Sequence, residues 1–171
     1  LALGSALVGA WALVNPVHHV IAKAPAETSL TPPTSLAPKA SWSKEISSTE
    51  LTTAAGAGGP ILLTDDGIMA LNPTDGSVLW SYNRKHANFD HNSPAFTNAT
   101  APVVTSPNGK YVALRALSPK FVDSVGDTLV FDTLTGRIVF KKTSTDGPLQ
   151  LTDSAVLDGN TAFSLTDGSQ M

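Results

Sequence analysis

Two histidines and an aspartate that lie close together are the residues in this chain best suited to chemistry. His86, Asp90 and His91 offer the nitrogen and oxygen donors that zinc and other transition metals accept. No further ligand stands at a spacing diagnostic of a metal site. We therefore interpret these three residues as weak metal-ligand candidates in a solvated loop, and we predict neither a metal site nor a catalytic residue.

The acidic residues favour turn formation over acid–base chemistry. Aspartate beside glycine or serine accepts hydrogen bonds from nearby backbone amides and so shapes tight turns. The residues expected in hairpin or capping roles are Asp65, Asp66, Asp75, Asp146, Asp153, Asp158 and Asp167. No serine or histidine lies in a nucleophile-elbow or metalloprotease motif, so hydrolysis is not indicated.

The composition excludes several classes of function. The 171 residues contain no cysteine, which rules out disulfides, thiolate zinc sites and cysteine nucleophiles. A net charge of −3 and a charged fraction of 15% argue against a surface that binds nucleic acid. The abundance of threonine, serine, glycine and proline favours an all-β fold.

One stretch, residues 61–80, predicts three short strands separated by two tight turns. Asp66 with Gly67 and Asp75 with Gly76 are dipeptides typical of hairpin turns. Shifting this unit by 92 positions gives seven identities in the twelve positions that begin at Asp66. A shift of 60 positions gives a weaker middle copy.

The recurrence of short strands predicts a β-propeller or a solenoid, since one small sheet cannot bury both of its faces without stacked neighbours. We expect an all-β, partial β-propeller, with the repeat positions playing structural roles. These positions are Gly67, Ala70, Leu71, Gly76, Trp80, Asp132, Gly136, Phe140, Gly159, Ala162 and Gly168. The copies are spaced unevenly, by 60 and then 32 residues, which indicates either an insertion or a wrong alignment of the middle copy.

Two further segments carry local signals. Residues 103–117 predict a hairpin in which Asn108 and Gly109 form a type I′ turn, whereas residues 84–102 predict a long loop. Residues 40–46 are expected to supply the first strand, with Trp42 buried in the manner of Trp80.

The chain divides into three regions by composition. Residues 1–22 carry no formal charge and predict a single-pass membrane anchor, a cleaved signal peptide or a buried helix, the anchor being preferred. Residues 23–58 predict a linker rich in proline, serine and threonine, and residues 59–171 predict incomplete propeller blades. We expect the C-terminal part to lie outside the cytoplasm, and we interpret the sequence as a fragment.

The repeat resembles the signature of pyrroloquinoline-quinone-type (PQQ-like) β-propellers. Positions that match the signature in the first copy are Gly67, Ala70, Leu71, Asn72, Gly76 and Trp80. In that family the aromatic residue packs between neighbouring blades, so the resemblance implies a fold and says little about function.

Three functions compete. The first is a non-catalytic module that is tethered to the membrane, needs no cofactor, and binds a protein or a ligand of the cell envelope. The second, implied by the resemblance, is a quinoprotein dehydrogenase with PQQ and calcium at the propeller axis. The absence of the cysteine pair typical of such enzymes weighs against it. The third is the sensor domain of a larger signalling protein. The sequence favours the binding module.

Overall fold

The computed structural model describes residues 17–23, 42–48, 51–84, 103–117, 126–144 and 148–171. All regular elements in these ranges are β-strands, and they form three antiparallel sheets. The first sheet has the order β1 (Val17–Val20), β5 (Val78–Arg84), β4 (Gly67–Leu71), β3 (Gly59–Thr64) and β2 (Thr52–Gly56). The second has the order β6 (Val103–Thr105), β7 (Tyr111–Leu117), β8 (Gly126–Asp132) and β9 (Ile138–Ser144). The third contains β10 (Leu149–Leu151), β11 (Ala155–Asp158) and β12 (Thr161–Ser164).

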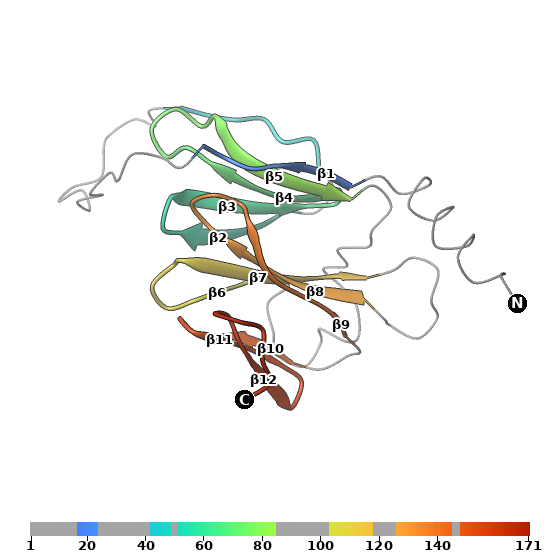
Figure 1. The fold of residues 1–171 in the computed structure, drawn as a ribbon. Helices are drawn as coiled ribbons and strands as arrows, with labels where there is room; N and C mark the ends of the chain where they lie inside the picture. The colour runs from blue at the N-terminus through green and yellow to red at the C-terminus, as the bar shows by residue number, and fades with distance from the viewer. Residues whose placement is uncertain (1–16, 24–41, 49–50, 85–102, 118–125, 145–147) are drawn as a thin grey trace, which may run out of the picture.

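The three sheets are stacked face to face (Figure 1). One apolar cluster fills the space between the first and second sheets, around Trp80 and Phe131. A second cluster, around Phe140 and Phe163, fills the space between the second and third. Strand β6 contacts β2 on one side and β10 on the other, along one edge of the stack. Consecutive antiparallel sheets stacked with their first strands together are propeller blades, and we name them blades 1, 2 and 3 in chain order.

The predicted repeat is confirmed at the turn between the third and fourth strands of each blade. The pairs that open the fourth strand are Leu71 with Val78, Phe131 with Ile138, and Phe163 with Gln170. The three turn glycines, Gly76, Gly136 and Gly168, have φ values of 72°, 72° and 73°. Each glycine amide donates to a carbonyl four residues earlier, at 2.8–2.9 Å. Both sequence shifts, 60 and 92, are therefore structurally correct.

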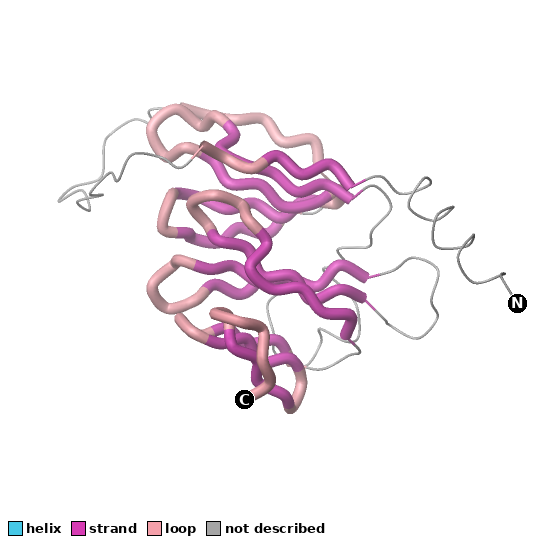
Figure 2. The backbone as a smooth tube through the Cα atoms, viewed as in Figure 1, coloured by secondary structure: helices cyan, strands magenta, loops and turns pink. Residues whose placement is uncertain are grey.

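Unequal connections at one end of the blades explain the uneven spacing. The connection from β5 to β6 spans positions 85–102, which is 18 residues, and the connection from β7 to β8 spans 118–125. In blade 3 the corresponding turn between β11 and β12 contains only Gly159 and Asn160. The turns that carry the repeat glycines are equal in length and lie at the opposite end of the strands, towards the left in Figure 2.

Tryptophan joins blade 1 to blade 2. The Trp80 side chain is completely buried, and its indole Nε1 donates to the Thr133 carbonyl in the turn of blade 2 at 2.7 Å. The ring stacks on Phe131, with ring centroids 5.7 Å apart. A Cβ atom placed on Gly136 would lie 2.6 Å from Trp80 Cδ2. The turn therefore needs glycine both for its positive φ and for the space that the indole occupies.

The start of the chain differs from the prediction. Val17–Val20 form a strand that pairs with β5, so the prediction of an apolar helical segment over residues 1–22 is wrong for residues 17–20. Residues 1–16 lie outside the described residues. No helix with the length and hydropathy of a membrane span occurs in the described part of the chain. Backbone pairing with β5 and a hydrogen bond from Ala22 to Thr135 hold this segment against blades 1 and 2.

The predicted linker and one predicted turn also differ. Thr52–Gly56 pair with β3, so the folded part begins before residue 59. Trp42 is half-buried and packs against blade 1, but residues 42–48 form no strand. The hairpin of β6 and β7 is confirmed, whereas its turn contains four residues, 107–110, between the bonded Ser106 and Tyr111 instead of two.

Replacing Gly136 with alanine tests the contact between the blades. We expect a loss of about 3 kcal/mol in the free energy of unfolding, from backbone strain at positive φ together with the collision with Trp80. Gly168→Ala is the matched control, because Gly168 has the same φ but no atom within 4 Å of the added Cβ. It should lose only about 1 kcal/mol. Urea denaturation gives both values, and equal losses would show that the indole contact contributes nothing.

Candidate functional site

The weak metal-ligand candidates cannot be placed. His86, Asp90 and His91 lie outside the described residues. Within the ranges that the structure describes, no three histidine or acidic side chains gather in a way that would hold a metal ion. The repeat residues, by contrast, occupy the strand ends and turns detailed above.

The aspartates of the repeat turns are occupied by their own turns. The Asp75 carboxylate accepts hydrogen bonds from the Ser77 hydroxyl at 2.7 Å and the Ser77 amide at 2.9 Å. These bonds lower the pKa of Asp75, and the corresponding bonds from Ser169 lower that of Asp167. Asp132 likewise accepts from the amides of Leu134 and Thr135. These carboxylates therefore serve the turns, as the sequence predicts.

Asp158 departs from its expected role in a hairpin. It is buried and forms an ion pair with Arg115, in which both side chains are only 3% exposed. Arg115 lies on β7 of blade 2 and Asp158 ends β11 of blade 3, so the pair joins two blades. The Arg115 Nε also donates to the Thr128 hydroxyl at 3.4 Å. The only sequence signal for this ion pair was Arg115 itself, a charged residue in a strand whose side chains alternate between the two faces of the sheet.

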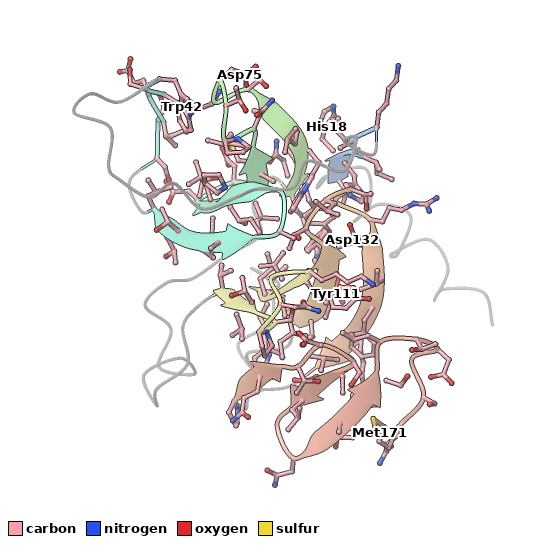
Figure 3. The ribbon with its side chains drawn as sticks, turned by 90° about the vertical axis from the view of Figure 1, so that its left-hand side faces the viewer. His18, Trp42, Asp75, Tyr111, Asp132 and Met171 are labelled. Atoms are coloured by element: carbon pink, nitrogen blue, oxygen red, sulfur yellow. The ribbon has the colours of Figure 1, made fainter. Side chains whose placement is uncertain are left out.

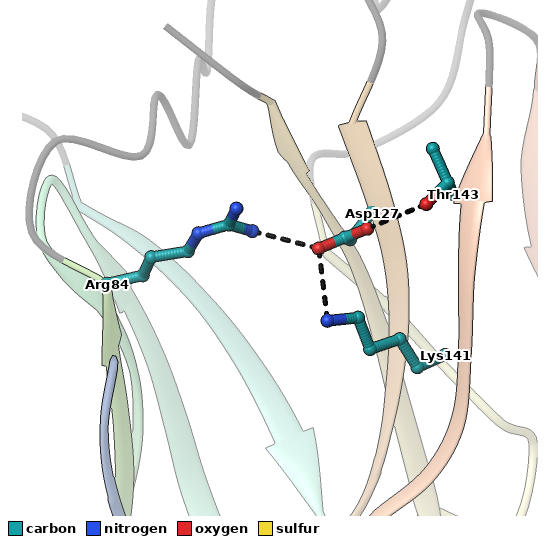
Figure 4. Close-up of polar contacts among 4 residues, drawn as sticks. All are labelled: Arg84, Asp127, Lys141 and Thr143. Carbon is teal, nitrogen blue, oxygen red and sulfur yellow. Dashed lines mark hydrogen bonds and ion pairs between the residues drawn. The ribbon is translucent and has the colours of Figure 1, made fainter. Parts of the chain in front are cut away.

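A second polar cluster joins blades 1 and 2 around the carboxylate of Asp127 (Figure 4). Arg84 Nη1 lies 3.0 Å from Asp127 Oδ2, and Lys141 Nζ lies 3.3 Å from the same oxygen. The Thr143 hydroxyl donates to Oδ1 at 3.2 Å. Arg84 comes from β5, Asp127 from β8, and Lys141 and Thr143 from β9. We name these four residues the Asp127 cluster.

The aromatic residues next to the cluster are tightly packed. Tyr82 is buried two residues before Arg84 on β5, and its ring lies 5.3 Å from that of Phe131. Desolvation raises the pKa of the Tyr82 hydroxyl, and the Asp127 charge adds to this effect, while the Arg84 charge opposes it. His19 from β1 packs edge-on against Tyr82 at 5.4 Å and reaches the Gly136 carbonyl through Nε2 at 2.7 Å. The phenol is therefore a neutral part of the interface between blades.

The Asp127 cluster lies at the end of the blades where the chain connects β5 to β6 and β7 to β8. Arg84 is the last residue of β5 and directly precedes positions 85–102. Asp127 is the second residue of β8 and follows positions 118–125. Arg84 and Asp127 are largely buried, with side chains 8% and 14% exposed, whereas the Lys141 side chain is 55% exposed. The cluster thus fixes the base of both connections and presents one ammonium group to solvent.

Charge complementarity and hydrogen bonding hold the cluster together. Two cations and a hydroxyl engage the Asp127 carboxylate. The three charges sum to +1, and the exposed charge is that of Lys141. Sequence reasoning missed the cluster because Arg84 lies 43 positions before Asp127, and no local pattern relates the two residues.

Comparison with known proteins finds a likeness in structure but none in sequence. No protein-family model matches the chain, and no curated protein matches it. Among solved structures, the chain is similar to BamB from Moraxella catarrhalis, with 17% sequence identity and a TM-score of 0.48. The similarity covers 77% of this chain and 42% of that one, so the chain spans less than half of the length of that protein. The blade architecture itself is defined by the sheets and repeated turns described above.

Proposed function

We propose that this chain is a non-catalytic β-propeller module that binds a protein or another ligand at the end of the blades where the Asp127 cluster lies. The observation that carries the proposal is the placement of the cluster. It anchors the connections from β5 to β6 and from β7 to β8 at one end, while the turns at the opposite end are short. Binding residues are commonly found on loops that a rigid scaffold positions.

The use of the charged groups supports a binding role over a catalytic one. Asp127 and Asp158 are each engaged by an arginine of a neighbouring blade, and Asp75, Asp132 and Asp167 are engaged by their own turns. In the described ranges, the charged side chain of the cluster that stays largely accessible is Lys141. An exposed cation beside long connections suits an acidic patch on a partner protein or an anionic ligand of the cell envelope.

Membrane attachment through the apolar start of the chain, with the C-terminal part outside the cytoplasm, is part of the proposal. Residues 1–14 contain no charged side chain and only one polar residue, a serine. Because β1 begins at Val17, an apolar span has to end before that strand.

A photocrosslinking amino acid at position 141 tests the binding end. We expect a discrete adduct with a partner in cells, because Lys141 is exposed beside the proposed surface. The matched control is position 139, an exposed position of β9 nearer the opposite end, where Val139 is 37% exposed. Adducts of equal yield at both positions, or none at position 141, would contradict the proposed site.

Titration with PQQ and calcium tests the absence of a cofactor. We expect no saturable absorbance change and no rise in melting temperature. A ligand that bound the native state would raise the melting temperature, so an unchanged value indicates that PQQ does not bind. The control titration uses calcium without PQQ. Saturable PQQ binding with a higher melting temperature would favour a quinoprotein over a binding module.

Alkaline extraction of membranes tests the attachment. A chain held by a hydrophobic span stays in the membrane pellet, whereas a peripheral or cleaved chain appears in the supernatant. We expect the uncleaved, full-length chain to remain in the membrane pellet. Release of the uncleaved chain into the supernatant would contradict membrane attachment, and a shortened soluble product would identify the apolar run as a signal peptide.

A further inference from the structure

Strand β1 is fastened to the blades along its whole length. All four of its residues pair with β5, and it forms one edge of the sheet of blade 1. Just after the strand, the Ala22 amide donates to the Thr135 carbonyl at 3.0 Å, and the His19 Nε2 lies 2.7 Å from the Gly136 carbonyl oxygen. Figure 3 shows β1, which carries His18, at the rim of blade 1. The segment is therefore a part of the folded blades.

Only two residues separate β1 from the apolar run of residues 1–14. Asn15 and Pro16 lie between Val14 and Val17. Three successive Cα–Cα steps span at most about 11 Å, even when the chain is fully extended. The headgroup layer on each side of a bilayer is about 5–8 Å thick. An apolar run held in a membrane therefore places Val17 in or directly above that layer, and the proline-rich stretch, which follows β1, cannot act as a spacer.

The exposed side chains of this segment are mostly apolar. Val17, Val20 and Ile21 are 52%, 44% and 50% exposed. They are three of the seven large apolar side chains that are exposed in the described part of the chain, and they lie within five consecutive positions. Apolar side chains gathered on one exposed surface indicate a contact site, and aliphatic groups favour the boundary between headgroups and acyl chains. We name these three residues the β1 rim.

The charges beside the β1 rim also suit a bilayer surface. Neither residues 17–23 nor β5 contains an acidic residue, so lipid phosphates would meet no carboxylate on these two strands. Lys23 is exposed at the end of the segment. A lysine in this position lays its apolar stem along the surface and brings its ammonium group to a phosphate.

We propose that the β1 rim contacts the surface of the bilayer that the apolar run enters, so that blade 1 lies with this edge against the lipid. The inference rests on the proposed membrane attachment and adds an orientation to it. The sheet order β1-β5-β4-β3-β2 places β2 four strand spacings, about 19 Å, from β1. The β2 edge therefore points away from the membrane. The blades are held against the bilayer, where a flexible linker would have left them free to turn.

A fluorescent label on a single cysteine tests the orientation. The chain has no cysteine, so Val20→Cys introduces one labelling site. The labelled full chain is reconstituted into phosphatidylcholine liposomes that contain lipids with a nitroxide on the headgroup, and the liposomes are recovered by flotation. We expect the label at position 20 to lose most of its fluorescence, because a nitroxide quenches a fluorophore only at close approach.

The matched control is Thr53→Cys, which should keep most of its fluorescence. Thr53 is exposed on β2 and lies in the same row across the sheet as Val20. The row runs through Val20, Ser81, Met69, Leu62 and Thr53. A second pair, Ile21→Cys and Leu51→Cys, compares aliphatic positions that are 50% and 49% exposed beside the same two edges. It repeats the test if the first pair does not fold.

The outcomes separate this inference from the attachment on which it rests. Equal quenching at positions 20 and 53, or none at position 20, in liposomes that carry the chain would overturn the orientation and leave the membrane attachment standing. A chain that does not float with the liposomes would overturn the attachment, and the orientation with it.

Discussion

The packing of one indole ring on one glycine turn is the contact on which the rest of the described stack depends. Trp80 can reach the Thr133 carbonyl only because Gly136 has no Cβ and adopts a positive φ. The ring then stacks on Phe131 and completes the apolar cluster between blades 1 and 2. A short antiparallel sheet has two faces to bury, and through this contact the neighbouring blade buries one of them.

Two buried ion pairs add a constraint of a different kind. Arg84 with Asp127 and Arg115 with Asp158 each connect neighbouring blades. Removing charges of this kind from water is costly, so such pairs contribute little net stability, yet separating the partners would leave an isolated buried charge. The pairs therefore fix how one blade sits on the next, while the apolar clusters supply most of the stabilisation. Their charges are used within the stack.

The sequence predicted what is decided locally. Asp75 with Gly76, and their counterparts around Gly136 and Gly168, specify a turn through a side chain and a φ value, so the repeat was visible without a structure. The role of Trp42 was recognised by analogy with Trp80. The pairing of β1 with β5 and the contact between Arg84 and Asp127 join residues more than 40 positions apart, which no local pattern encodes. The apolar composition that predicted a membrane segment is equally compatible with Val17 and Val20 in an edge strand.

The constant length of the glycine turns has a consequence for how this protein can change over evolutionary time. Residues 72–77, 132–137 and 164–169 are each six long, and in the first two an added residue would displace the glycine or the carbonyl that a tryptophan contacts. At the other end, the turn between the second and third strands contains two residues in blades 1 and 3 and eight in blade 2. A change in chain length therefore disturbs the stack less between the second and third strands than at the glycine turns.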